Sequence, residues 1–313
     1  MYFPYLRGKQ FELIALRELV DILDPGKVIP IVEPLKRSTK SVVTAATALA
    51  KKDIRIQLIV NPQYGELVNR SNDVVVLIDE LANAGINNII PTFLVNSNRD
   101  YTLLRDIISE NDYDNCGYAL VHLNQTNTAD ELSTLAKGTN CLYSTIQINH
   151  LIALRRKYRP DVPVAFLNDP FVKQQKNADY LHDDDEVFSN DYLYYEEEGC
   201  AAFGDYLTIG SDFVDGGMLP YAVVIHLTYR EEGSEDIRIH HFVSDSNDDY
   251  NDPGGKFYEA LGKLVEFVDA RGMDNTIAIR QFKDYYRREA FPGLGVIKKL
   301  SIMHHIELVQ SLI

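Results

Sequence analysis

The chain has few cysteines, and none of them lies in a metal-binding or disulfide-rich arrangement. Its 313 residues include only Cys116, Cys141 and Cys200, which are far apart and form no C-x-x-C pair. This spacing indicates neither a zinc knuckle nor a disulfide framework. It is typical of a protein kept in a reducing cytosol.

Long apolar runs are also missing. No stretch reaches the roughly 18 consecutive apolar residues that a membrane-spanning helix needs, and the N-terminus MYFPYLRGKQ lacks the apolar core of a secretion signal. We therefore expect a soluble, cytoplasmic protein with no membrane partner. The composition, with 45% hydrophobic and 25% charged residues, is that of an ordinary globular protein.

Established catalytic motifs are absent. The sequence contains no H-E-x-x-H, no G-x-x-x-x-G-K-[ST], no G-x-S-x-G, and no G-x-G-x-x-G after the first apolar run. No metal site is predicted, and the sequence leaves the cofactor unknown.

Basic residues are nearly absent from one segment. Residues 179–253 hold 20 Asp and Glu against two Arg, a net charge of −18, while the whole chain carries −15. Such a field disfavours DNA or RNA, whose phosphates need clustered Lys and Arg, and suits a basic protein partner. The one basic patch is small and diluted by acidic neighbours: Arg280, Lys283 and Arg287.

Eight short apolar runs are present instead, and each ends on a polar residue. The runs are PYLR, IPIVE, QLIVN, TFLVN, LVHLN, TIQIN, VAFLN and AAFGD. Between successive endings there is room for a loop and a helix, and apolar stripes of helical period fill most of these intervals. The rhythm predicts an α/β fold, a (β/α)₈ TIM-like barrel. A doubly wound open sheet is the alternative, disfavoured by the number of units and the missing glycine motif.

The remainder of the chain is read as additions to this barrel. YAVVIHLTYR and IRIHHFVSD predict an antiparallel hairpin at about 221–244, inserted after strand eight. Residues 170–199 are interpreted as an elaborated seventh crossover, and 256–313 as C-terminal helices. We predict one domain over 1–313, with 179–253 its acidic elaboration.

In a TIM barrel the C-terminal ends of the strands meet on the face that carries the chemistry. If every run ends on an inward-pointing residue, Arg7 lies between Glu33 and Asp205, with Lys9 and Glu12 beside it. The two carboxylates are then candidates for acid/base catalysis, and the two cations for binding an anion. A structural ion-pair network is the alternative.

Amide side chains dominate the other run endings. Amides donate and accept hydrogen bonds without ionising, so a ring of them would orient a polar ligand; the alternative is that each Asn starts a turn. One layer below, His122 and Gln147 would form a polar wall or a bonded core pair. The predicted ring consists of Asn61, Asn96, Asn124, Asn149, Asn168 and Asp169.

Three histidines lie on the expected hairpin. Adjacent residues in a strand face opposite ways, so His240 and His241 cannot both reach one metal ion, although His226 could face one of them. Without metal-ligand spacing, we interpret them as part of a solvent-exposed hairpin face.

The opening YFPYLRGKQFELIALRELVD, followed by IPIVEPLK and a later Gly204-Asp205-Tyr206, resembles the bacterial and phage "beta family protein" group over about residues 1–210. The residues that carry the resemblance are Arg7, Lys9, Glu12, Glu33 and the Gly-Asp-Tyr triplet. The resemblance implies a TIM-like barrel from a phage-defence or mobile-element cassette, placed beside a nuclease-like partner.

Two functions follow as expectations. The first is a hydrolase or lyase that acts on a small polar or anionic substrate at the barrel mouth, with Glu33 or Asp205 moving protons. The second is a non-catalytic sensor or partner subunit that binds a basic protein through its acidic segment. Fold alone does not choose between them.

Overall fold

The chain divides into two compact units. The computed structural model describes residues 1–214, 216 and 220–313. The barrel unit consists of Met1–Leu13, Val20–Asn168 and Leu193–Asp205. The second unit consists of Ile14–Leu19, Asp169–Tyr192 and Tyr206–Ile313. A single domain over 1–313 stays a prediction.

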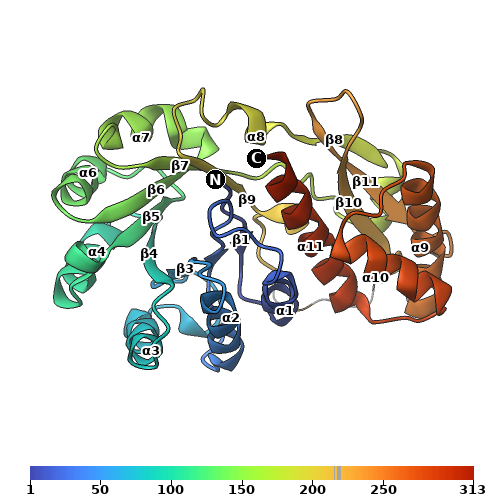
Figure 1. The fold of residues 1–313 in the computed structure, drawn as a ribbon, viewed down its shortest axis with the longest axis horizontal. Helices are drawn as coiled ribbons and strands as arrows, with labels where there is room; N and C mark the ends of the chain where they lie inside the picture. Colours follow the sequence, from blue (N-terminus) through green and yellow to red (C-terminus); the bar gives the residue numbers. More distant parts are fainter. Residues whose placement is uncertain (215, 217–219) are drawn as a thin grey trace. The chain divides into compact units, whose positions relative to one another are not determined.

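Eight parallel strands make up the sheet of the barrel unit, and all eight apolar runs supply one each. The strands are β1 (Tyr5–Leu6), β2 (Ile31–Val32), β3 (Ile56–Ile59), β4 (Ile89–Val95), β5 (Tyr118–His122), β6 (Cys141–Gln147), β7 (Val164–Asn168) and β9 (Ala202–Asp205). They lie side by side in the order of the chain (Figure 1). A doubly wound sheet would reverse its order part-way, so that alternative is wrong.

The N-terminal segment joins the last strand to the first. Tyr2 forms a parallel bridge with Phe203 and another with Val28. The backbone N–H of Phe3 donates to the carbonyl of Phe203 (2.8 Å), and the N–H of Phe203 donates to the carbonyl of Met1 (3.0 Å). These bonds nearly close the sheet into the expected TIM-like barrel.

Helices alternate with the strands, as the apolar periodicity predicts. They are α1 (Gln10–Leu19), α2 (Lys40–Ala50), α3 (Ser71–Asn83), α4 (Asp100–Glu110), α5 (Tyr113–Cys116), α6 (Ala129–Gly138) and α7 (Leu151–Tyr158). Helix α3 illustrates the cause, because Val74, Ile78 and Leu81 are buried along one stripe whereas Val76 is 54% exposed. Across the residues that the structure describes, no helix combines the length and the apolar character needed to cross a bilayer.

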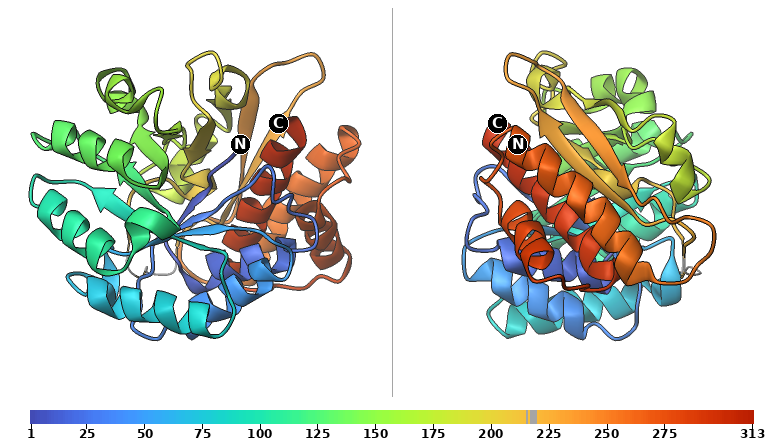
Figure 2. Two further views of the ribbon diagram at one scale, coloured as in Figure 1. Left: turned by 60° about the vertical axis from the view of Figure 1, so that its left-hand side comes forward. Right: turned by 90° about the vertical axis from the view of Figure 1, so that its right-hand side faces the viewer.

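The second unit holds a three-stranded antiparallel sheet and three long helices. Its elements are β8 (Asp185–Ser189), β10 (Val224–Arg230), β11 (Ile237–Val243), α9 (Pro253–Ala270), α10 (Ile277–Arg287) and α11 (Leu294–Leu312). The residues of the short helix α8 (Asp191–Tyr194) are divided between the two units. The predicted hairpin and C-terminal helices are therefore confirmed. Helices α9 and α11 contact the hairpin, and α10 lies against both (Figure 2).

Strand β8 was missing from the sequence prediction. It pairs with β11, which makes the strand order β10-β11-β8. Its sequence DEVFS does not look like a strand because two acids open it. Asp185 lies 2.5 Å from the guanidinium of Arg238, and Glu186 lies 3.2 Å from the ring of His241, so each carboxylate has a partner on the neighbouring strand.

Closure of the barrel predicts a strict requirement at Gly204. A Cβ added there would lie 2.3 Å from the backbone oxygen of Phe3. We expect Gly204→Ala to lower the free energy of unfolding by about 1–3 kcal/mol, the usual cost of overpacking. Denaturant unfolding followed by circular dichroism measures this.

The matched control is Gly138→Ala at the end of α6, where an added Cβ meets no atom within 4 Å. That variant is expected to keep or slightly raise the stability of the protein. Equal stability of the two variants would contradict the closure described above.

Candidate functional site

The strand register decides which side chains enter the barrel. The ring of Tyr143 on β6 meets Phe3, with centroids 5.0 Å apart, and its hydroxyl accepts a hydrogen bond from Arg55 (3.1 Å). Phe3 and Arg55 come from distant strands, so all three side chains point inward. Paired residues on adjacent strands share this face: Tyr5, Ile31, Gln57, Ile90, Thr92, Ala119 and Tyr143.

The other set of alternating residues faces the helices. It includes His122, whose ring centroid lies 5.2 Å from that of Tyr158 on α7. His122 pairs with Ile146, Ile146 with Phe166, and Phe166 with Phe203, so all four side chains lie on this face. Asp205 is two residues after Phe203 in the same strand and therefore lies on this face too. Asp205 is buried there and accepts a hydrogen bond from the hydroxyl of Tyr2 (2.7 Å).

Two expectations about the mouth are consequently wrong. Asp205 lies on the face opposite to Glu33 and Arg7, so the two carboxylates do not converge. His122 and Gln147 also lie on opposite faces, because His122 is level with Ile146. Both expectations assumed that the last residue of every apolar run points into the barrel. That assumption fails for the runs that form β5, β7 and β9.

Glu33 is the most constrained group at the mouth. Its side chain is fully buried. One carboxylate oxygen accepts a hydrogen bond from the hydroxyl of Tyr5 (2.9 Å), and the other from the backbone N–H of Gln63 (2.8 Å). Burial raises the pKa of Glu33, opposed by these hydrogen bonds and by the charge of Arg7.

Arg7 completes an ion pair inside the barrel. Its Nε lies 3.6 Å from Oε2 of Glu33, and only 6% of its side chain is exposed. The guanidinium carbon lies 5.2 Å from the ring centroid of Tyr64 and 6.0 Å from that of Tyr5. Residues from β1, β2 and the loop after β3 therefore enclose one charged pair.

Glu12 holds the loop that follows β1. Its Oε2 accepts a hydrogen bond from the backbone N–H of Arg7 (2.6 Å), and the backbone of Lys9 also bonds to its carboxylate. Burial raises its pKa, and these bonds oppose the rise. Glu12 thus positions Arg7, whereas Lys9, at the N-terminus of α1, is exposed.

Part of the amide ring forms a chain of hydrogen bonds along the mouth. The side-chain amide of Asn124 donates to Oδ1 of Asn96, and the amide of Asn96 donates to Oε1 of Gln63 (3.2 Å). The backbone of Gln63 donates in turn to Glu33. Asn96 and Asn124 are exposed, so the chain links solvent-facing amides to the buried carboxylate.

The other predicted amides behave differently. Asn61 bonds to both the N–H and the carbonyl of Leu94 (2.8 and 2.9 Å), extending the pairing of β3 with β4. Asn149 is exposed in a short 3-10 helix, η2 (Ile148–His150). Asn168 ends β7, and Asp169 accepts a hydrogen bond from the backbone of Ser211 within the second unit.

Gln57 lies inside the barrel on β3 and is not among the predicted site residues. It is fully buried, and among the described residues neither Nε2 nor Oε1 has a hydrogen-bond partner. The hydroxyl of Thr145, also buried and inward, lacks one as well. A glutamine inside the apolar run IRIQLIV was the available signal, because buried amides are normally satisfied.

A second set of buried polar side chains lies between the sheet and α7. His122 Nε2 has no hydrogen-bond partner within the part of the chain that the structure describes, and the hydroxyl of Tyr158 interacts with that of Ser144. Burial lowers the pKa of His122 to about 3, so its imidazole is neutral. These groups face the helix layer and do not contribute to the mouth.

The hairpin histidines were expected to lie on a solvent-exposed face, but the structure does not place them there. His241 is buried, and its Nδ1 lies 2.7 Å from Nδ1 of the cross-strand neighbour His226. No group of three or more metal-ligating side chains occurs in residues 1–214, 216 and 220–313. In the basic patch, Lys283 pairs with Asp269 and Arg287 with Asp284, which reduces its charge further.

Comparisons with known proteins find no matching family model, no matching curated protein and no matching solved structure. Membership of the "beta family protein" group therefore stays a prediction.

The environment of Glu33 predicts its titration. We expect its carboxyl carbon, followed by NMR as the pH is varied, to titrate at a pKa above the ordinary value of a glutamate. Tyr5→Phe removes a hydrogen bond to the charged form and should raise the pKa of Glu33 further. A pKa of Glu33 at or below the ordinary glutamate value would show that burial does not dominate.

The unpartnered amide of Gln57 predicts a stabilising substitution. Each unsatisfied buried polar atom costs about 1–3 kcal/mol, so Gln57→Leu should raise the free energy of unfolding by about that amount. Asn61→Leu is the matched control, because it removes an amide that is fully bonded and should destabilise the protein. Denaturant unfolding measures both, and a loss of stability in Gln57→Leu would contradict the expectation.

Proposed function

We propose that the barrel unit binds a small polar or anionic substrate at the ends of β1 to β5 and acts on it as a hydrolase or lyase. The observation that carries this proposal is the buried Glu33 carboxylate beside Arg7. Burying such a pair is expensive, and it lies where barrel enzymes keep their chemistry.

Glu33 would serve as the single proton-transferring group. General acid/base catalysis is most effective when the pKa lies close to the operating pH, and burial moves the pKa of Glu33 in that direction. Asp205 is not proposed as a second carboxylate, because the strand register places it on the other face of the sheet. The chemistry that fits is one proton removed from a carbon acid or from a water molecule, rather than a two-carboxylate mechanism.

The amide chain would orient the substrate. Asn96 and Asn124 are exposed, do not ionise, and are held in place by their mutual hydrogen bond. The positive charge of Arg7 favours a substrate that carries or develops negative charge next to Glu33. Gln57, deeper in the barrel, would supply a donor and an acceptor to a group that reaches past the ion pair.

A thermal-shift screen tests the proposal. The probes are orthophosphate, sugar phosphates and short hydroxy- and dicarboxylic acids, each added in excess. A compound present at about 100 times its Kd should stabilise the wild-type protein by about 2.7 kcal/mol. We expect Asn96→Ala to weaken this effect and Glu33→Gln to abolish turnover of the same compound.

The control variant is Asn149→Ala, an exposed amide that no hydrogen bond among the described residues joins to the chain of amides. It should bind like the wild type. If no probe stabilises the wild type, or if Asn96→Ala and Asn149→Ala bind every active probe equally, the proposed site is wrong.

A further inference from the structure

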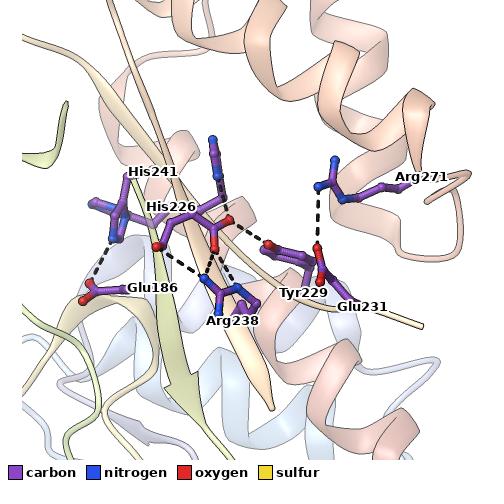
Figure 3. Close-up of polar contacts among 9 residues, drawn as sticks. Glu186, His226, Tyr229, Glu231, Arg238, His241 and Arg271 are labelled. Carbon is purple, nitrogen blue, oxygen red and sulfur yellow. Dashed lines mark hydrogen bonds and ion pairs between the residues drawn. The ribbon is translucent and has the colours of Figure 1, made fainter. Parts of the chain in front are cut away.

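Two histidines of the second unit share a hydrogen bond across the hairpin. His226 on β10 is paired with His241 on β11, and their rings are nearly perpendicular, at 84°. The two Nδ1 atoms are 2.7 Å apart. On the other side, Nε2 of His241 lies 3.2 Å from Oε1 of Glu186 on β8 (Figure 3).

Counting protons along this row fixes the tautomers. A carboxylate only accepts, so Nε2 of His241 carries a hydrogen and donates to Glu186. In a neutral His241 the Nδ1 atom is then an acceptor, and Nδ1 of His226 must donate to it. One proton therefore lies between the two rings, and Nε2 of His226 is left with a lone pair.

Aromatic rings from one segment cover the pair. The cover segment, residues 171–181, brings Phe171 to 5.0 Å from His226 and Tyr180 to 4.5 Å from His241, measured between ring centroids. The amide of Asn177 fastens this segment to the hairpin by donating to the carbonyl of Ala222 (2.8 Å).

Few charges are placed to stabilise a second proton. Lys298 on α11 acts unfavourably on a charged His226, and His240 does so on a charged His241. On β8, Glu186 and Asp185 favour the charge, but Asp185 bonds to Arg238, Tyr229 and His240 on the opposite face of the sheet. Tyr180 of the cover segment meets the pair with a neutral ring, whereas Lys173 pairs with Asp212 and Asp179 accepts a hydrogen bond from the backbone of Lys176.

We propose that Glu186, His241 and His226 form a pH switch that holds the cover segment on the hairpin while the two rings share one proton. A second proton either breaks the Nδ1–Nδ1 hydrogen bond or places a positive charge among Phe171, Tyr180 and Lys298. Both outcomes favour release of the cover segment, because the released histidines are solvated and bind the proton freely.

The direction of the pH dependence follows from linkage. Burial lowers the pKa of His241 to about 4 and that of His226 well below its usual value. The open state therefore binds more protons, so the closed state loses stability as the pH falls from about 6.5 towards 4 and is unaffected above that range. For His241 alone, a change from pH 8 to pH 5 raises the opening equilibrium about 30-fold.

Hydrogen–deuterium exchange of the full chain, corrected for intrinsic rates, tests the switch. We expect the protection of residues 171–181 to fall by about 30-fold or more between pH 8 and pH 5, while β5 is little changed. The double variant His226→Phe/His241→Phe keeps two rings in place and removes both titrating groups, so its protection should not depend on pH. His182→Gln, an exposed histidine next to the segment, should behave like the wild type.

Three outcomes would overturn the proposal. The first is a change in wild-type protection of less than threefold, and the second is a pH dependence that survives in the double variant. The third is an increase in protection on adding Zn²⁺ at neutral pH that the double variant lacks, which would make the pair a metal site. If the double variant does not fold, ¹⁵N NMR of the wild-type imidazoles at pH 8 tests the pH switch instead. The switch requires Nε2–H on His241 and Nδ1–H on His226, and any other pair of tautomers contradicts it.

Discussion

The bonds between the N-terminal segment and β9 are the constraint on which the barrel mouth depends. The backbone N–H of Phe3 donates to the carbonyl of Phe203, and the backbone oxygen of Phe3 lies so close to position 204 that only glycine fits there. Once Phe3 is placed in this way, regular alternation turns Tyr5 and Arg7 inward. The hydroxyl of Tyr5 then reaches Glu33 on the neighbouring strand, and the charge of Arg7 lies beside it.

This geometry explains how a buried carboxylate is tolerated. Glu33 loses its hydration completely, and an isolated charge in that position would be prohibitive. Tyr5 and Arg7 at β1, and the backbone of Gln63 after β3, replace the lost water. The side chain of Gln63 also accepts a hydrogen bond from Asn96, so one residue connects the exposed amides to the buried charge.

The strands could be predicted from the sequence because parallel strands covered by helices are continuously apolar. The same property hides which face of each strand is inward. All five residues of β5 are buried, so nothing in YALVH distinguishes His122 from Val121. The face is determined by the register around the whole barrel, and for this reason the positions of Glu33 and Arg7 were predicted correctly while that of Asp205 was not.

In the acidic segment, the charged residues of β8 prevented the strand from being predicted from the sequence. Asp185 and Glu186 are adjacent, so they face opposite sides of the sheet, and each meets its own basic or imidazole partner on β11. Burial alone would raise the pKa of Asp185, but hydrogen bonds from Tyr229, His240 and Arg238 outweigh burial and lower the pKa below its usual value. The carboxylate therefore stays ionised as a structural group. Part of the charge of −18 is therefore used within the fold. A basic protein partner would have to recognise the exposed acids, among them Glu196 and Glu197, and not the pair that builds β8.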